Sequence, residues 1–213
     1  MITLFHNRSG SYISLGGVYE VKNKSTTIKE ITAKVFRQSD NATLSLIWST
    51  FPSPIYRKVA GNFETSFETA HSFKVEADTL APAFVEFADK CANMDEVSNN
   101  ILYPVVCATM PIFSQPNATL PIVDGAVRAL PEYALAKIAL NDHFFWKADE
   151  YEMVITTIHS KGTFDKKYVF SLSDAESFRL RNNIDSVLVS HVANHFGIPV
   201  QVNTVAKGFK EKN

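Results

Sequence analysis

The sequence predicts an α+β fold, in which helices pack on a mixed or antiparallel sheet. Two patterns favour this class: some segments alternate apolar and polar residues, as half-solvated strands do, and others repeat apolar residues every three or four positions, as helices do. The 213 residues are 46% hydrophobic and 12% aromatic, which is enough for a sizeable core. We expect one compact domain, residues 1–213, with possible halves 1–112 and 113–213.

In the first half, strands are expected at residues 12–21, 43–51 and 63–77. The last shows the clearest alternation, with Phe67, Phe73 and Val75 on its buried face. Short helices are expected at 28–39 and 82–91, because apolar residues recur there at helical spacing. The first helix would begin at a capping box, Thr27-Ile28-Lys29-Glu30.

The second half contains clearer start and stop signals. A short strand is expected at 121–123, a helix at 131–145, and a hairpin of strands 151–158 and 167–172 joined through Gly162. Ser173 and Asp174 would cap a long helix, 175–196, that ends at Gly197, before a last strand at 199–205. This order is β-α-β-β-α-β, and the first half can be interpreted in the same way, so the preferred architecture is two tandem ferredoxin-like halves.

Composition excludes several classes of function. The formal net charge is -1, so no basic excess indicates a nucleic-acid partner. No apolar run is long enough to span a membrane, and no secretory signal is recognisable. Cys91 and Cys107 lie in apolar stretches and are expected to be buried free thiols. Together these features favour a cytoplasmic protein without a cofactor.

His191 and His195 are the candidate metal ligands. They are four residues apart on the expected long helix, which places two imidazoles on one face, as metal binding requires. However, Val192 stands where the HExxH motif needs Glu, and a third ligand such as His159 cannot be placed from the sequence. Packing against apolar neighbours is the preferred interpretation, and a metal-binding module is the alternative.

Asp124 is the candidate catalytic residue. The stretch formed by residues 108–113, Pro116, Val123-Asp124-Gly125-Ala126 and Pro131 resembles the later half of patatin-like lipid acyl hydrolases. In that family the Asp before Gly belongs to a Ser–Asp dyad, so the resemblance implies a hydrolase with Asp124 as its base. The G-x-S-x-G nucleophile elbow is absent from this chain.

No complete catalytic set follows from these candidates. The densest aromatic group, residues 143–146 with Tyr151, is interpreted as core packing or as a contact between subunits. The sequence therefore favours a non-catalytic structural or assembly subunit that works in a homo-oligomer or with other protein subunits, such as a viral or phage particle component. The Asp124 hydrolase and the His191–His195 metal module remain as alternatives.

Overall fold

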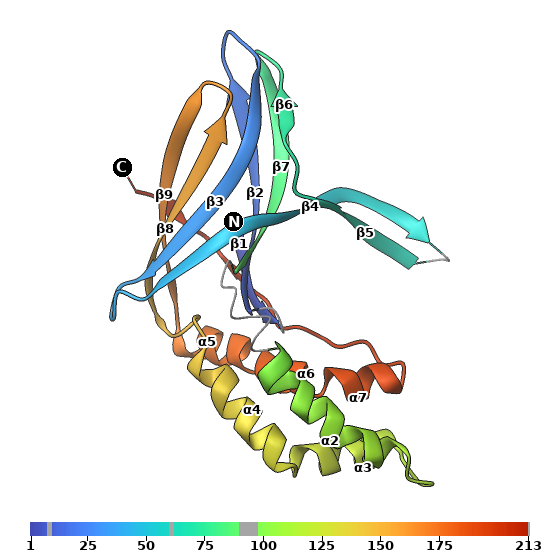
Figure 1. The fold of residues 1–213 in the computed structure, drawn as a ribbon. Coiled ribbons are helices and arrows are strands. Elements are labelled where there is room, and N and C mark those ends of the chain that lie inside the picture. Colours follow the sequence, from blue (N-terminus) through green and yellow to red (C-terminus); the bar gives the residue numbers. More distant parts are fainter. Residues whose placement is uncertain (8–9, 60–61, 90–97, 213) are drawn as a thin grey trace.

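The computed structural model consists of a curled antiparallel sheet with a group of helices at one end (Figure 1). The model describes residues 1–7, 10–59, 62–89 and 98–212, with side chains except at 51–68, 82 and 98. The strands are β1 Ile2–Asn7, β2 Gly10–Val21, β3 Thr26–Arg37, β4 Thr43–Val59, β5 Asn62–Thr69, β6 Phe73–Val75, β7 Thr79–Asp89, β8 Asp149–His159, β9 Gly162–Leu172, β10 Val205–Lys207 and β11 Lys210–Glu211. The helices are a π-helical segment, Ser98–Leu102, followed by α2 Tyr103–Phe113, α3 Leu120–Arg128, α4 Pro131–Asp142, α5 Asp174–Arg181, α6 Asn183–Leu188 and α7 Ser190–His195.

One sheet contains strands from both halves of the chain. Its order is β10-β1-β2-β7-β4-β3-β8-β9-β11, with β5 on β4 and β6 on β3. Strand β8 pairs with β3, and β10 pairs with β1. The α+β class is confirmed, but two tandem ferredoxin-like halves are not found, because the strands of residues 1–112 and 113–213 interleave in a single sheet.

The sheet curls until its distant strands face each other. Strands β7, β4 and β3 lie between β2 and β8 in the order, yet the hydroxyls of Tyr19 on β2 and Thr157 on β8 are 3.4 Å apart. The ring of Tyr19 also packs edge-on against Phe73 of β6, with centroids 5.8 Å apart. The concave face of the sheet therefore encloses one side of the core.

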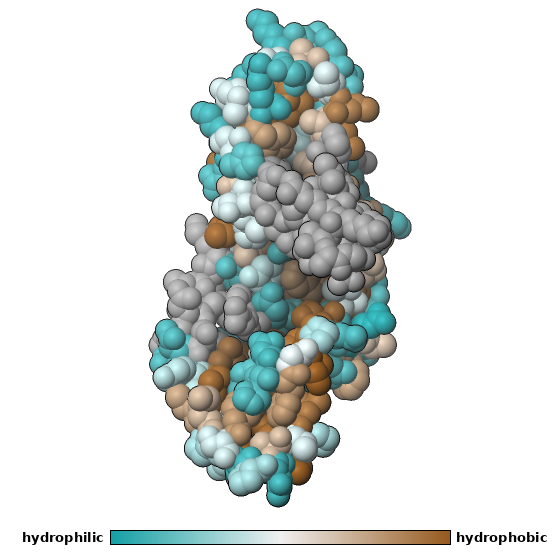
Figure 2. All heavy atoms as spheres, turned by 90° about the vertical axis from the view of Figure 1, so that its right-hand side faces the viewer, coloured by the Kyte–Doolittle hydropathy of each residue, from teal (hydrophilic) through white to brown (hydrophobic). Residues whose placement is uncertain are grey.

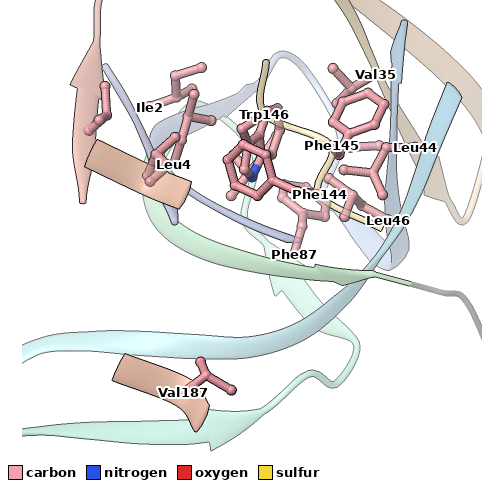
Figure 3. Close-up of a cluster of buried hydrophobic side chains, with 14 of the residues drawn as sticks. Ile2, Leu4, Val35, Leu44, Leu46, Phe87, Phe144, Phe145, Trp146 and Val187 are labelled. Carbon is pink, nitrogen blue, oxygen red and sulfur yellow. The ribbon is translucent and has the colours of Figure 1, made fainter. Parts of the chain in front are cut away.

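The loop after α4 inserts three aromatic side chains into this core. Phe144, Phe145 and Trp146 are all buried, and Figure 3 shows them among the apolar side chains of several strands. The indole of Trp146 donates a hydrogen bond to the Phe5 carbonyl at 3.2 Å, and Ser177 donates to the Trp146 carbonyl at 2.7 Å. Core packing is therefore confirmed for this aromatic group.

The helix expected at 28–39 is a strand, β3. Its core-facing side chains include Ile28, Ile31 and Val35, all buried. The pairing of β3 with β8 shifts register between Ile28 and Glu30. Such a bulge adds one residue and reverses the alternation of faces. Two buried positions therefore become three residues apart, which imitates helical spacing.

The prediction of a helix at 82–91 is also wrong for the described residues, 82–89. These residues belong to strand β7, Thr79–Asp89. Phe87 is fully buried and Phe84 is largely exposed, so the two rings lie on opposite faces of a strand. Pairing with β2 along residues 79–88 satisfies the backbone here. Cys91 lies outside the described residues.

The strand expected at 121–123 belongs instead to helix α3, whose first turn contains Pro121. A first-turn proline is compatible with a helix, because the first amides have no intrahelical acceptor. Pro104 is likewise in the first turn of α2. The strand expected at 199–205 is found only at Val205, in the short β10.

The long helix expected at 175–196 is three short helices, α5 to α7. Ser173 caps the first of them as expected, in a capping box with Glu176, and Gly197 ends α7 with a φ of 67° in the left-handed region that glycine tolerates. The first break follows Asn182. There the buried Asn183 side chain exchanges two hydrogen bonds with the backbone of Asn203, at 2.7 and 2.8 Å.

Other expectations for the strands and helices are confirmed. These are strand 12–21, the start of strand 43–51, the helix that begins at Pro131, and the hairpin through Gly162. Segment 63–77 forms two strands, β5 and β6, as a bent pair would. Val75 is buried and Phe73 is half-buried, while the side chain of Phe67 lies outside the described residues.

The hairpin of β4 and β5 forms an arm that extends away from the curled sheet (Figure 1). Strand β4 continues past the expected stop at Pro52 and Pro54, where its pairing with β5 shifts register. Proline lacks an amide donor and is accommodated at such irregularities. Pairing of β4 with β3 ends at Ile47 and pairing with β7 at Thr50. Beyond these points, the backbone pairing described for β4 is with β5 alone.

Candidate functional site

The helical end of the molecule begins with a long stretch that has no charged side chains. Residues 98–123 include no Asp, Glu, Lys, Arg or His. Two helices, α2 and the beginning of α3, lie within this stretch. Surface helices of globular proteins normally present a charged or polar face to water, so an uncharged surface at this end calls for an explanation.

Helix α2 is apolar on both its inner and its outer side. Val105 and Thr109 face the core and are buried, and the Thr109 hydroxyl donates to the Val105 carbonyl at 2.7 Å. On the opposite side, Tyr103, Cys107 and Met110 are exposed. These three are spaced by four and three residues, and they therefore form one stripe along the helix. The exposure of Cys107 overturns the expectation that its thiol is buried.

Helices α3 and α4 continue the apolar surface. Ile122 is exposed at the beginning of α3, and Leu135 and Ile138 are exposed on α4. The side chains of α4 that face the core are Tyr133, Ala136 and Leu140. Leu135 and Ile138 also have apolar helical spacing, but they point away from the core. Helix α4 therefore has a second apolar face that the chain itself leaves uncovered.

These outward side chains form what we call the helical surface. Its members are Tyr103, Cys107, Met110, Ile122, Leu135 and Ile138, and five of them expose between 52% and 68% of their area. Helices α2, α3 and α4 contact one another in all three pairs. Figure 2 shows hydrophobic atoms gathered over the helical end, at the bottom of that view. Soluble monomers rarely expose large contiguous apolar patches.

A network of charged side chains holds the helices behind this surface. The Tyr133 hydroxyl donates to Asp185 of α6 at 2.5 Å and accepts from Arg128 at 3.0 Å. Lys137 lies 2.7 Å from the same Asp185 carboxylate. Burial and the hydrogen bond to Asp185 raise the pKa of Tyr133. Burial opposes ionisation of Asp185, but the hydrogen bonds from Lys137 and Tyr133 lower its pKa overall.

Asp124 belongs to this network. Its carboxylate lies 2.8 Å from the Nε of Arg128, one turn later on α3. Within the described part of the chain, no serine hydroxyl is hydrogen-bonded to Asp124. The interaction found here is an ion pair on a helix, which holds α3 to α4 through Arg128.

His191 and His195 both lie on α7, as the spacing predicted. The Nε2 of His191 is 2.9 Å from the Thr109 hydroxyl, and burial lowers the pKa of His191. The ring of His195 stacks on Phe113 of α2, with centroids 4.0 Å apart. His159 ends β8 in the sheet. Among the described side chains, no group of three or more His, Cys, Asp or Glu is arranged to hold a metal ion.

The helical surface was not predicted from the sequence. Its signal is nonetheless present, because interface cores are depleted in charged residues and residues 98–123 contain none. We found no protein family, curated protein or solved structure that matches the chain. Within the described ranges, no helix combines the length and apolar character needed to cross a membrane.

Proposed function

We propose that the protein is a non-catalytic structural subunit that assembles with copies of itself through the helical surface. The observation that carries this proposal is the exposed apolar surface on α2, α3 and α4, together with the absence of charged side chains from residue 98 to 123, in α2 and the start of α3. A second copy of the chain is the occupant that we infer. Like-charge repulsion between two such faces is small, and the net charge of the chain is only -1.

The apolar area is large enough to offset much of the cost of association. Burying a side chain of this size contributes about 1.5–3 kcal/mol, and Tyr103, Met110, Ile122, Leu135 and Ile138 are each more than half exposed. Covering all five would contribute roughly 5–9 kcal/mol per subunit. A symmetric dimer uses the same face twice. The gain is therefore of the same order as the association cost of about 4–15 kcal/mol.

The β4–β5 arm supports the same proposal. An isolated two-stranded hairpin is marginally stable in water, and its open edges can pair with another chain. Beyond Thr50 the described pairing of β4 is with β5. In an assembly, the arm would pack on a neighbouring subunit while the helical surface forms the main contact. A repeating particle, a viral or phage one included, is the setting that suits such a subunit.

The test introduces charges into the helical surface. We expect the double substitution Met110→Lys and Leu135→Lys to convert the oligomer to single chains in sedimentation velocity, because two desolvated ammonium groups would oppose the contact. Leu80→Lys is the matched control, since Leu80 is 69% exposed but lies on β7, outside the helical surface.

Two results would contradict the proposal. One is a wild-type protein that sediments as a single chain at every concentration. The other is an oligomer that survives the double substitution unchanged. Loss of the oligomer in the Leu80→Lys control would also count against the helical surface as the contact, because it would point to the sheet.

A further inference from the structure

The concave side of the curled sheet contains a pocket of about 270 Å³. It lies between facing strands, with β2 and β7 on one side and β8 and β9 on the other. Leu15, Val85 and Ile155 supply apolar walls. Ligand sites often occupy the mouths of curled or closed sheets. An apolar cavity of roughly 150 Å³ is enough to hold benzene, so this pocket has room for an aromatic ring with a substituent.

A buried hydroxyl, from Thr157, and a half-buried one, from Tyr19, meet in this pocket. The hydroxyls of Tyr19 and Thr157 are 3.4 Å apart, which is long for an O–H···O hydrogen bond. Thr157 is only 1% exposed, and burial raises the pKa of Tyr19. Each hydroxyl can donate once and accept twice. A single long bond therefore leaves hydrogen-bonding capacity that a ligand can use.

The rest of the lining is largely aromatic, with Lys166 and the exposed Glu20 as its charged members. Tyr19, Phe164 and Tyr168 all line the pocket, and aromatic rings prefer edge-on or offset contact with other rings. Lys166 is also at the pocket, but its ammonium group is paired with Glu211 of β11. A charged ligand would have to compete with that ion pair, whereas a neutral one would not.

We infer that this pocket binds a small neutral aromatic molecule that carries one hydroxyl group, with Tyr19 and Thr157 as its hydrogen-bonding partners. This pocket is separate from the helical surface, which lies on α2, α3 and α4 and not on the strands that line the pocket.

The probes are 4-fluorophenol and fluorobenzene, followed by ¹⁹F NMR with the full-length protein. We expect saturable binding of 4-fluorophenol and several-fold weaker binding of fluorobenzene. Thr157→Val removes one hydroxyl and keeps the shape of the side chain. It should weaken 4-fluorophenol binding by about fivefold, as expected for one hydrogen bond, and leave fluorobenzene binding unchanged.

Gly17→Leu tests the location of the site. Gly17 lines the pocket, and a Cβ atom added there would meet no atom within 4 Å, so the new side chain fills open space and should abolish binding of both probes. Gly125→Leu on α3 is the matched control, because Gly125 is equally uncrowded, and it should bind as the wild type does. The inference is overturned if wild-type protein shows no saturable binding, if Gly17→Leu binds normally, or if Thr157→Val affects both probes equally.

Discussion

The buried His6 should make the protein lose stability in mildly acidic solution. His6 lies on β1 with 3% of its surface exposed, and its ring packs edge-on against Phe144, with centroids 5.4 Å apart. Burial lowers the pKa of His6 from 6.5 to about 4. Above pH 6.5 the ring is neutral in both the folded and the unfolded chain, so its contribution to stability is fully present there.

Between pH 6.5 and 4 the unfolded chain binds a proton at His6 and the folded chain does not. Each pH unit in this window lowers the free energy of unfolding by about 1.4 kcal/mol. His6 should therefore account for a loss of about 3 kcal/mol over the whole window. His6→Phe keeps an aromatic ring beside Phe144 but has no group to titrate.

The assay is urea denaturation of both proteins at pH 7 and at pH 4.5, followed by circular dichroism. We expect the wild type to lose about 2–3 kcal/mol more than His6→Phe between the two pH values. Other titrating groups, such as His191 with its lowered pKa, are present in both proteins and cancel in the comparison. Equal losses in the two proteins would refute the reasoning, because they would mean that His6 is protonated in the folded chain.

Three further substitutions test the packing of the helices by urea denaturation at neutral pH. Ser173→Ala removes the capping box of α5 and should lower the free energy of unfolding by about 1 kcal/mol; an unchanged midpoint would show that the cap does not contribute. Asn183→Ala removes both hydrogen bonds to Asn203. It should lower the free energy of unfolding by about 2 kcal/mol or more, because buried backbone groups lose their partners. A smaller effect than that of Ser173→Ala would contradict this expectation. Tyr133→Phe removes the hydroxyl bonded to Asp185 and should lower the free energy of unfolding by about 1–2 kcal/mol, and a neutral effect would show that the network is dispensable.

Elements whose conformation depends on neighbouring residues could be predicted from the sequence. The hairpin through Gly162 and the helix cap at Ser173 depend on residues close together in the chain, and both were predicted. The spacing of apolar residues gave a wrong prediction where pairing with a strand distant in the sequence determines the conformation. Phe84 and Phe87 are three residues apart, as on one face of a helix, but pairing with β2 places them on opposite faces of β7.

The candidate surface was not predicted, although part of its signal is present in the sequence. Helix α4 has two apolar faces, and only the tertiary packing selects the face with Tyr133, and not the face with Leu135, for burial. The absence of charge from residue 98 to 123 was visible in the sequence. Its meaning required the structure, because an uncharged stretch in a buried segment would need no partner. Likewise, the sequence placed His191 and His195 on one helix but could not reveal their contacts with α2.

The mass of the wild-type protein in solution, measured by light scattering across a dilution series, tests the proposed self-assembly most directly. A mass that is a multiple of 23.8 kDa, decreasing only on strong dilution, is the result predicted by an apolar helical surface that covers its counterpart on another copy. A constant mass of one chain across the series would contradict the proposed assembly and leave the apolar surface without its inferred occupant.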